Sequence, residues 1–313
     1  MDERDEQALK AVKLYYEAGL SQAEVAAEIG VSRPTAARLL AHAKDRGFVT
    51  IEIHDPREQG GEISTQLLEK FGQYGLTDAR VVATARSDQE QLLKELGRAG
   101  AEVLEERVKD GDLLGVSWGT TMFAVARALT PTSRRGVEIV QLKGGMSYTE
   151  SSTNDIETIN LFCRAFDAYA RTLPLPVIFD NAETKRVVEK DRHIKQLLEL
   201  GAHTDIVIFT VGHTHVDALT MSLGYLSEEE REQLSRVAVG DACSRFYTRD
   251  GQIALPSVDE RTVGISLDAL ASRPTRILVA GGRWKAEAIE VALRMGLATH
   301  LVIDRETAQD IVD

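Results

Sequence analysis

Lys143 is the side chain best placed for covalent chemistry, because it follows an apolar run and precedes two glycines. Residues 137–142 are typical of a buried strand, so the lysine that follows them is expected to be partly withdrawn from water. Loss of water lowers the pKa of a lysine, and the neutral amine can attack a carbonyl carbon. Gly144 and Gly145 would let a ligand approach the backbone closely. Alternatively, Lys143 only pairs with a phosphate or a carboxylate group.

Two further glycine turns follow apolar runs, after residues 112–116 and after residues 277–280, and both run into predicted helices. A helix N-terminus attracts anions because its free N–H groups and its dipole converge there. In open α/β sheets, ligands bind outside the carboxyl ends of the strands, where these turns lie. A plain helix cap by Ser or Thr is the alternative. The candidate anion-binding residues are Ser117, Gly119, Thr120 and Thr121 in the first turn and Lys285 in the second.

Three other polar residues could belong to a site. Asp241 could bind sugar hydroxyl groups, although a turn-forming aspartate is the more common explanation in isolation. His213 and His215 resemble a pair of metal ligands. No cysteine or third histidine accompanies them in the spacing of a zinc site, so neither a metal nor another cofactor is expected.

Residues 19–55 have the pattern of a helix-turn-helix followed by a wing strand at 48–53. Ser21 and Glu24 form a capping box at the start of the first helix. Ser32 is expected to cap the second helix, with Pro34 in its first turn. The second helix should turn Ala37, Leu40 and Ala41 inward and Arg33, Thr35, Arg38 and Lys44 outward.

This segment predicts a DNA-binding module, because such a helix pair places its second helix in the major groove. Residues 31–48 contain four basic residues and one acidic residue, a local charge of +3, whereas the whole chain carries −12. A basic face on an acidic protein indicates phosphate contacts confined to one module, although two helices packed in an ordinary core are the alternative. The residues expected at the DNA are Ser21, Gln22, Ser32, Arg33, Pro34, Thr35, Arg38 and Lys44, with Arg33, Thr35 and Arg38 at base edges and Lys44 near phosphate.

The remaining chain alternates apolar strands with helices, which predicts an α/β fold with a mostly parallel sheet covered on both faces. The polar, glycine-bearing residues 55–61 mark the boundary between domains 1–54 and 55–313. A helix at 62–72 could be a linker or an oligomer contact. Residues 243–254 are typical of a hairpin that turns at 249–251. Strands are expected at 80–83, 112–116, 137–142, 177–179, 206–211, 277–280 and 301–303, and helices at 89–108, 120–129, 182–200 and 284–293.

Length and composition agree with two domains of an ordinary globular protein. The chain has 313 residues, of which 43% are hydrophobic and 27% charged. The apolar runs are strand-sized and too short to cross a membrane. The charged N-terminus lacks an apolar signal region, and the two cysteines show no paired or metal-like spacing. These features predict a cytoplasmic protein.

Five motifs occur in an order that resembles the SorC-type sugar-binding transcriptional regulators. They are GLSQAEVAAEIGVSRPTAARLL, DLLGVSWGTT, LKGG, GDACSRFYTRDG and VAGGRWKAEAI, and they extend over nearly the whole chain. The resemblance implies a larger domain with a Rossmann-like fold similar to ribose-5-phosphate isomerases and glucosamine-6-phosphate deaminases. It also implies a phosphosugar effector, operator DNA as a partner, and a homo-oligomer, dimer or tetramer.

Within that family, the LKGG motif most resembles the deoxyribonucleoside regulators. This resemblance implies that Lys143 forms a Schiff base with deoxyribose 5-phosphate and that Asp241 faces a sugar hydroxyl. It implies that Ser117, Gly119, Thr120 and Thr121 hold the phosphate with help from Lys285. The chain would then be a repressor of sugar catabolism genes that leaves its operator when the effector binds. A phosphosugar isomerase or aldolase with an attached DNA-binding module is the alternative, and it would need a general base beside Lys143, which no nearby carboxylate in the sequence supplies.

Overall fold

The computed structural model describes residues 3–49, 61–83, 88–147, 149, 153–215 and 218–313. The chain consists of two compact units, Met1–Pro56 and Arg57–Asp313. Among the described residues, no helix is both long and apolar enough to cross a membrane.

The N-terminal unit is helical. It contains α1 (Glu3–Val12), a short π-helical turn η1 (Lys13–Glu17), α2 (Gln22–Ile29) and α3 (Arg33–Asp45). The inward face of α3 is formed by Ala36, Leu39, Leu40 and Ala43, whereas Ala41 is exposed. The predicted inward set is therefore confirmed for Leu40 and wrong for Ala41, while Ala37 is half-buried. The reason is that α3 contacts both α1 and α2, which rotates its buried stripe.

The predicted wing strand lies largely outside the described residues. Phe48 and Val49 are not in a strand and pack, half-buried, against the core of the N-terminal unit. Residues 50–53 are not described.

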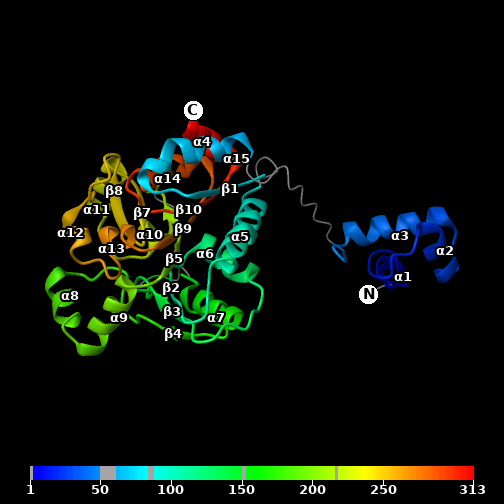
Figure 1. Ribbon diagram of the computed structural model, residues 1–313, viewed down its shortest axis with the longest axis horizontal. Coiled ribbons are helices and arrows are strands. Elements are labelled where there is room, and N and C mark those ends of the chain that lie inside the picture. The colour runs from blue at the N-terminus through cyan, green and yellow to red at the C-terminus, as the bar shows by residue number, and fades with distance from the viewer. Residues whose placement is uncertain (1–2, 50–60, 84–87, 148, 150–152, 216–217) are drawn as a thin grey trace. The chain divides into compact units, whose positions relative to one another are not determined.

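A seven-stranded sheet forms the centre of the second unit (Figure 1). Its order is β1-β10-β9-β5-β2-β3-β4, and every neighbouring pair is parallel. The predicted α/β fold with a mostly parallel sheet is thereby confirmed. The strands are β1 (Asp78–Val82), β2 (Leu113–Val116), β3 (Glu138–Gln141), β4 (Tyr169–Arg171), β5 (Ile206–Phe209), β9 (Thr275–Val279) and β10 (His300–Asp304).

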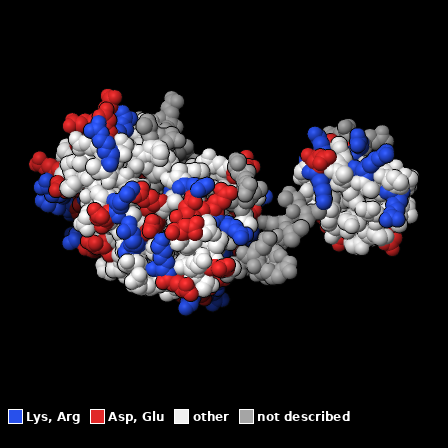
Figure 2. All heavy atoms as spheres, turned by 90° about the horizontal axis from the view of Figure 1, so that it is seen from above, with Lys and Arg blue, Asp and Glu red and all other residues white. Residues whose placement is uncertain are grey.

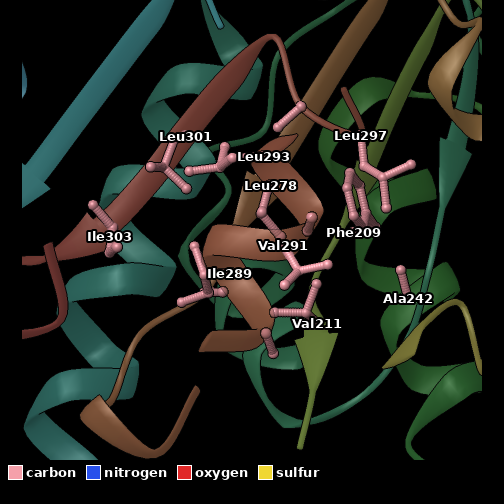
Figure 3. Close-up of a cluster of buried hydrophobic side chains, with 14 of the residues drawn as sticks. Phe209, Val211, Ala242, Leu278, Ile289, Val291, Leu293, Leu297, Leu301 and Ile303 are labelled. Atoms are coloured by element: carbon pink, nitrogen blue, oxygen red, sulfur yellow. The ribbon is translucent and has the colours of Figure 1, made fainter. Parts of the chain in front are cut away.

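Helices cover both faces of this sheet because its central strands are apolar at consecutive positions, as in β5, where all four residues are buried. One face carries α5 (Gln89–Glu105), α6 (Thr120–Ala128) and α7 (Asp155–Phe166), and the other carries α4 (Glu62–Phe71), α14 (Ala286–Arg294) and α15 (Arg305–Val312). Figure 3 shows the second of these cores, where Phe209 and Leu278 from the strands meet Ile289 and Val291 of α14.

The second unit also contains a separate, three-stranded antiparallel sheet. It contains β6 (Val211–Gly212), β7 (Ala238–Ala242) and β8 (Arg245–Thr248) in that order. Ala242 pairs with Arg245, so β7 and β8 turn at Cys243 and Ser244. The hairpin predicted within residues 243–254 is confirmed, because the chain turns again at residues 249–251, the Thr248 N–H donates to the Gln252 carbonyl at 2.8 Å, and Tyr247 bridges to Ile253.

Some elements differ from the sequence predictions. Residues 177–179 form only an isolated bridge, and the edge position belongs to β4, whose three side chains are all exposed and carry no apolar signal. The helix predicted at 182–200 is divided into α8 (Ala182–Val188) and α9 (Arg192–Ala202), because Asp191 caps the second helix. The other short elements are η2 (Gly72–Tyr74), α10 (Leu219–Ser222), α11 (Glu228–Val237), α12 (Pro256–Asp259), α13 (Leu267–Ala271) and η3 (Arg283–Lys285).

Candidate functional sites: a pocket at the sheet edge and a basic helix

A pocket lies at the carboxyl edge of the large sheet, where the strand order reverses. From β2 the chain continues to β3 and β4 on one side, whereas β5, β9 and β10 lie on the other side. Ligands of open parallel sheets bind at this switch point. The segments that follow β2, β3, β5 and β9 all line the pocket. They contribute Gly119, Thr120, Thr121, Lys143, Thr210 and Lys285.

The N-terminus of α6 is open toward the pocket. Gly119 precedes this helix with φ +132° and ψ 175°, a conformation that essentially only glycine adopts. A Cβ at Gly119 would meet no described atom within 4 Å. Backbone N–H groups of the first helical turn can therefore face a ligand, as an anion site requires.

The Lys143 amine is buried in the wall of this pocket. Its Nζ lies 3.7 Å from the centroid of the Trp118 ring and 3.2 Å from Ser244 Oγ. Trp118 is itself fixed, because its Nε1–H donates to the Gly144 carbonyl at 2.9 Å. Burial lowers the pKa of Lys143, and the nearby Asp241 opposes this change. The amine thus loses its proton more readily than an exposed lysine would.

The buried Asp241 and the half-buried Lys285 complete a group of charges around Lys143. Burial raises the pKa of Asp241, and the two lysines oppose that rise. Burial also lowers the pKa of Lys285 to about 8, against the attraction of Asp241. Asp241 Oδ2 accepts a hydrogen bond from the Ser244 N–H at 2.9 Å. A Cβ at Gly212 would lie 2.1 Å from Asp241 Oδ1, so glycine is needed where this carboxylate passes.

The turn that bears Lys285 is held from below by Asp304. The Gly282 N–H donates to Asp304 Oδ2 at 2.8 Å, and Asp304 also caps α15. A Cβ at Gly281 would lie 2.5 Å from the same oxygen. The two glycines of this turn therefore let its backbone pack directly against the buried Asp304 carboxylate. This packing fixes the turn in the position from which Lys285 lines the pocket.

Three of the predicted effector-binding residues lie behind the pocket wall and do not line it. Ser117 is buried. A Cβ at Gly144 would lie 2.2 Å from the Pro176 carbonyl oxygen, and one at Gly145 would lie 1.8 Å from an Asp155 carboxylate oxygen. These glycines accommodate neighbouring segments of the protein, so the expectation that they admit a ligand is corrected.

Several pocket residues were not predicted from the sequence. Thr210 follows β5 and could have been found by the same rule that identified Lys143. Gln89 and Thr220 come from helix starts outside that rule. Ser244, in the β7–β8 turn, does not line the pocket but contacts the Lys143 amine from behind its wall. His213 and Trp284 also line the pocket. His213 lies with its ring 5.2 Å from that of His215, but no group of three or more metal-ligating side chains occurs in the described ranges.

The helix-turn-helix forms as predicted. The Ser21 N–H donates to Glu24 Oε2 at 2.8 Å, and the Glu24 N–H donates back to Ser21 Oγ at 3.4 Å. Ser32 caps α3, and its hydroxyl lies 2.8 Å from that of Thr35. The caps fix where each helix begins.

The side chains predicted to meet DNA have different surroundings. Arg33, Pro34, Arg38 and Lys44 are exposed along α3, whereas Gln22 is half-buried and Thr35 is half-buried against its cap. Figure 2 shows Lys and Arg side chains gathered on the visible face of the N-terminal unit.

A buried carboxylate was missed in this unit. Asp5 of α1 accepts hydrogen bonds from His42 Nε2 at 2.8 Å and from Arg46 Nη2 at 2.9 Å. The bonds from His42 and then Arg46 lower the pKa of Asp5. These contacts anchor the end of α3 to α1, and no local sequence pattern announces them.

Residues 58–313 match the family of sugar-binding domains, and residues 2–49 match the homeodomain-like domains. The chain belongs to the SorC-type sugar-binding transcriptional regulators. It is 45% identical over 311 residues to the deoxyribonucleoside regulator of Bacillus subtilis (strain 168), covering 99% of this chain and 98% of that protein. It is 29% identical to the sorbitol operon regulator of Klebsiella pneumoniae, with 96% of each chain covered.

Solved structures of this family have the same fold. The full-length sorbitol operon regulator SorC from Klebsiella pneumoniae matches with a TM-score of 0.76 at 26% identity over 100% of both chains. A domain of a sugar-binding transcriptional regulator from Arthrobacter aurescens TC1 matches with a TM-score of 0.74 at 29% identity, covering 83% of this chain and 99% of that one. A SorC-type protein of this kind is a transcriptional regulator rather than an enzyme, which decides against the isomerase or aldolase alternative.

Proposed function

We propose that this regulator is a repressor of deoxyribonucleoside or sugar catabolism genes that senses deoxyribose 5-phosphate. The observation that carries the proposal is the buried amine of Lys143, with its lowered pKa, in the wall of the switch-point pocket. The 45% identical relative, a deoxyribonucleoside regulator, supports the choice of sugar. No cofactor or metal enters the proposal.

In this proposal the effector spans the pocket from α6 to β3. Gly119, Thr120 and Thr121 bind the phosphate at the N-terminus of α6, and Lys285 supplies a positive charge. Lys143 bonds to C1 of the open-chain sugar, and Asp241 faces a hydroxyl group. Ser117, Gly144 and Gly145 act behind the wall by shaping the segments that carry these groups.

The covalent step requires a neutral lysine. The Lys143 nitrogen adds to the aldehyde carbon, the carbonyl oxygen takes a proton, and the nitrogen gives one up. The hydroxyl group then leaves as water together with the remaining proton of the nitrogen, and the C=N bond of the Schiff base forms. Burial supports this step because it favours the neutral amine.

The N-terminal residues 1–54 form the DNA-binding domain of this proposal, and residues 55–313 bind the effector and assemble a dimer or tetramer. Arg33, Thr35 and Arg38 read base edges, and Lys44 contacts phosphate. Ser21, Gln22, Ser32 and Pro34 place the helices at the groove. Effector binding favours an arrangement of the oligomer that no longer fits the operator. A coupling free energy of about 1–3 kcal/mol would weaken operator binding roughly 5- to 150-fold.

The decisive test is intact-mass spectrometry of the full chain after incubation with deoxyribose 5-phosphate and cyanoborohydride. We expect a single stable adduct that is lost in Lys143→Ala, and a weaker signal with ribose 5-phosphate. Operator affinity, measured with and without the same sugar phosphate, should fall on its addition. A wild-type protein without an adduct, or with unchanged operator affinity, would refute the proposal.

A further inference from the structure

The two-residue turn between β7 and β8 has an unusual backbone for its sequence. Cys243 and Ser244 both have positive φ values, 51° and 67°. Hairpin turns of this kind normally use Asn or Gly, because other side chains are strained there. Strained residues persist where the surroundings hold them in place, and they concentrate at functional sites.

Ser244 is also in direct contact with the reactive amine. It is fully buried, and its Oγ lies 3.2 Å from Lys143 Nζ. Its backbone N–H donates to Asp241 Oδ2 at 2.9 Å. The Asp241 carboxylate therefore stabilises the turn whose Ser244 hydroxyl contacts the Lys143 amine. On its other side, the amine faces the ring of Trp118 at 3.7 Å.

The neighbouring Arg245 fixes the backbone beside Lys143. Its guanidinium donates to the carbonyl oxygens of Gly264 at 3.0 Å and Ile265 at 2.8 Å. Gly264 bridges to Lys143, and the Ile265 N–H donates to the Leu142 carbonyl at 2.8 Å. The same hairpin therefore holds the lysine twice, at its amine through Ser244 and at its backbone through Arg245.

We propose that Ser244 is a positioning residue for Schiff-base formation, whose hydroxyl aims the Lys143 amine at the aldehyde carbon. The inference rests on the proposed function. An amine on a four-carbon chain has many rotamers, and a fixed hydrogen bond to Ser244 reduces them to those that face the pocket. Ser244 does not bond to the sugar. The left-handed conformation of Cys243 and Ser244 places the Ser244 hydroxyl beside the Lys143 amine.

Two substitutions at Ser244 separate the hydroxyl from the backbone. Ser244→Gly removes the hydroxyl and suits the positive φ, so the turn should form without strain. Ser244→Ala removes the same hydroxyl but keeps the Cβ. If the hydroxyl positions Lys143, both variants should slow adduct formation with deoxyribose 5-phosphate by about 10- to 100-fold.

The matched control is Asp167→Gly. Asp167 has φ 49° at the end of α7, is exposed, and lies outside the pocket. This change relieves the same kind of backbone conformation and should leave the adduct rate at the wild-type value. Each rate is measured by quenching with borohydride at timed intervals across a pH series, and the variants are compared on the alkaline plateau.

Two further readouts identify a positioning role. Deoxyribitol 5-phosphate, which has no aldehyde, should bind both Ser244 variants as it binds wild type. The pH profile of adduct formation should move to lower pH, because the loss of a hydrogen-bond acceptor disfavours the protonated amine.

The outcomes are distinct. Wild-type adduct rates in both Ser244 variants, or equal losses for deoxyribitol 5-phosphate and for the aldehyde, would overturn the role of Ser244 while leaving the Schiff base intact. A wild-type protein that forms no adduct at all overturns the proposed function and this inference together.

Discussion

Replacing Lys285 with methionine should raise the unfolding free energy of the effector-free protein and lower its affinity for a sugar phosphate. Burial lowers the pKa of Lys285 from its usual 10.5 to about 8, so the folded protein holds this proton less tightly than the unfolded chain. A difference of one pKa unit corresponds to about 1.4 kcal/mol. The protonated lysine at pH 7 therefore costs at most about 3 kcal/mol of folding free energy. Lys285→Met, similar in length and uncharged, removes that cost.

The same difference in pKa makes the stability of wild type depend on pH. Between pH 8 and 10.5 the unfolded chain binds the Lys285 proton and the folded protein has lost it, so stability rises with pH in that window. Raising the pH from 8 to 9 should add about 1 kcal/mol to wild type. Lys285→Met should lack that part of the increase, while the buried Lys143, present in both proteins, contributes equally to each.

The assay is urea unfolding of the full chain at pH 7, 8 and 9, followed by the transition of the larger unit. In parallel, calorimetry with deoxyribitol 5-phosphate measures phosphate binding without the covalent step. Wild-type affinity should fall above pH 8 as Lys285 loses its proton, and the variant should bind about 10- to 100-fold more weakly at pH 7 with little pH dependence. Equal stability and equal affinity of the two proteins would refute the assignment of Lys285 to the phosphate.

Four other substitutions test the pocket and the N-terminal unit. Gly119→Ala should strain the start of α6, where φ is +132°, and weaken deoxyribitol 5-phosphate binding about tenfold or more, while operator affinity measured by fluorescence anisotropy stays unchanged. In the same anisotropy assay, Arg38→Ala should lose about 1–3 kcal/mol of operator-binding free energy and relax the base preference at one operator position. Lys44→Ala should weaken binding to all DNA sequences alike and reduce the slope of log affinity against log salt concentration by about 1. Identical effects of the two substitutions would contradict the assignment of Arg38 to a base and Lys44 to a phosphate. Asp5→Asn should lower the melting temperature of the N-terminal unit, because it weakens the bonds to His42 and Arg46. Because the pKa of Asp5 is lowered in the folded protein, its contribution to the stability of wild type is present above pH 4 and is lost as the pH falls further. The melting temperatures of wild type and Asp5→Asn should therefore be closer at pH 3 than at pH 7. Calorimetric scans that show the same difference at both pH values would contradict this.

Local signals explain why the helix-turn-helix was predictable. Ser21 and Glu24 bond to each other within one helical turn, so their spacing in the sequence is their spacing in space. The inward face of α3 was less predictable, because it depends on the angle at which α1 crosses α3. Asp5 bonds to His42 and Arg46 at the far end of α3, 37 and 41 residues along the chain, so no local pattern predicts these contacts.

The pocket residues that directly follow a strand of the large sheet could also be predicted from the sequence. Every parallel strand ends at the same edge of the sheet, so reading the residue after each strand found Gly119, Lys143 and Lys285. Pocket residues from helix starts, such as Gln89 and Thr220, follow no such rule, and neither does Ser244, which contacts the Lys143 amine from the β7–β8 turn. The glycines after Lys143 show the opposite error, because a glycine can admit a neighbouring carbonyl as well as a ligand.

The position of Asp241 bears on why this pocket suits a sensor. The sequence shows no carboxylate near Lys143, yet the small sheet brings one there, and among the described pocket-lining residues it is the only carboxylate. Thr220 and the Ser244 N–H both bond to it, so its oxygens are held in place. An isomerase or aldolase must move a proton or break a C–C bond at a second sugar carbon, which needs a base free to exchange protons there. A held carboxylate beside a buried amine instead suits the proposed function, in which an aldehyde is captured reversibly, the sugar leaves unchanged, and binding would favour one of two arrangements of the proposed oligomer.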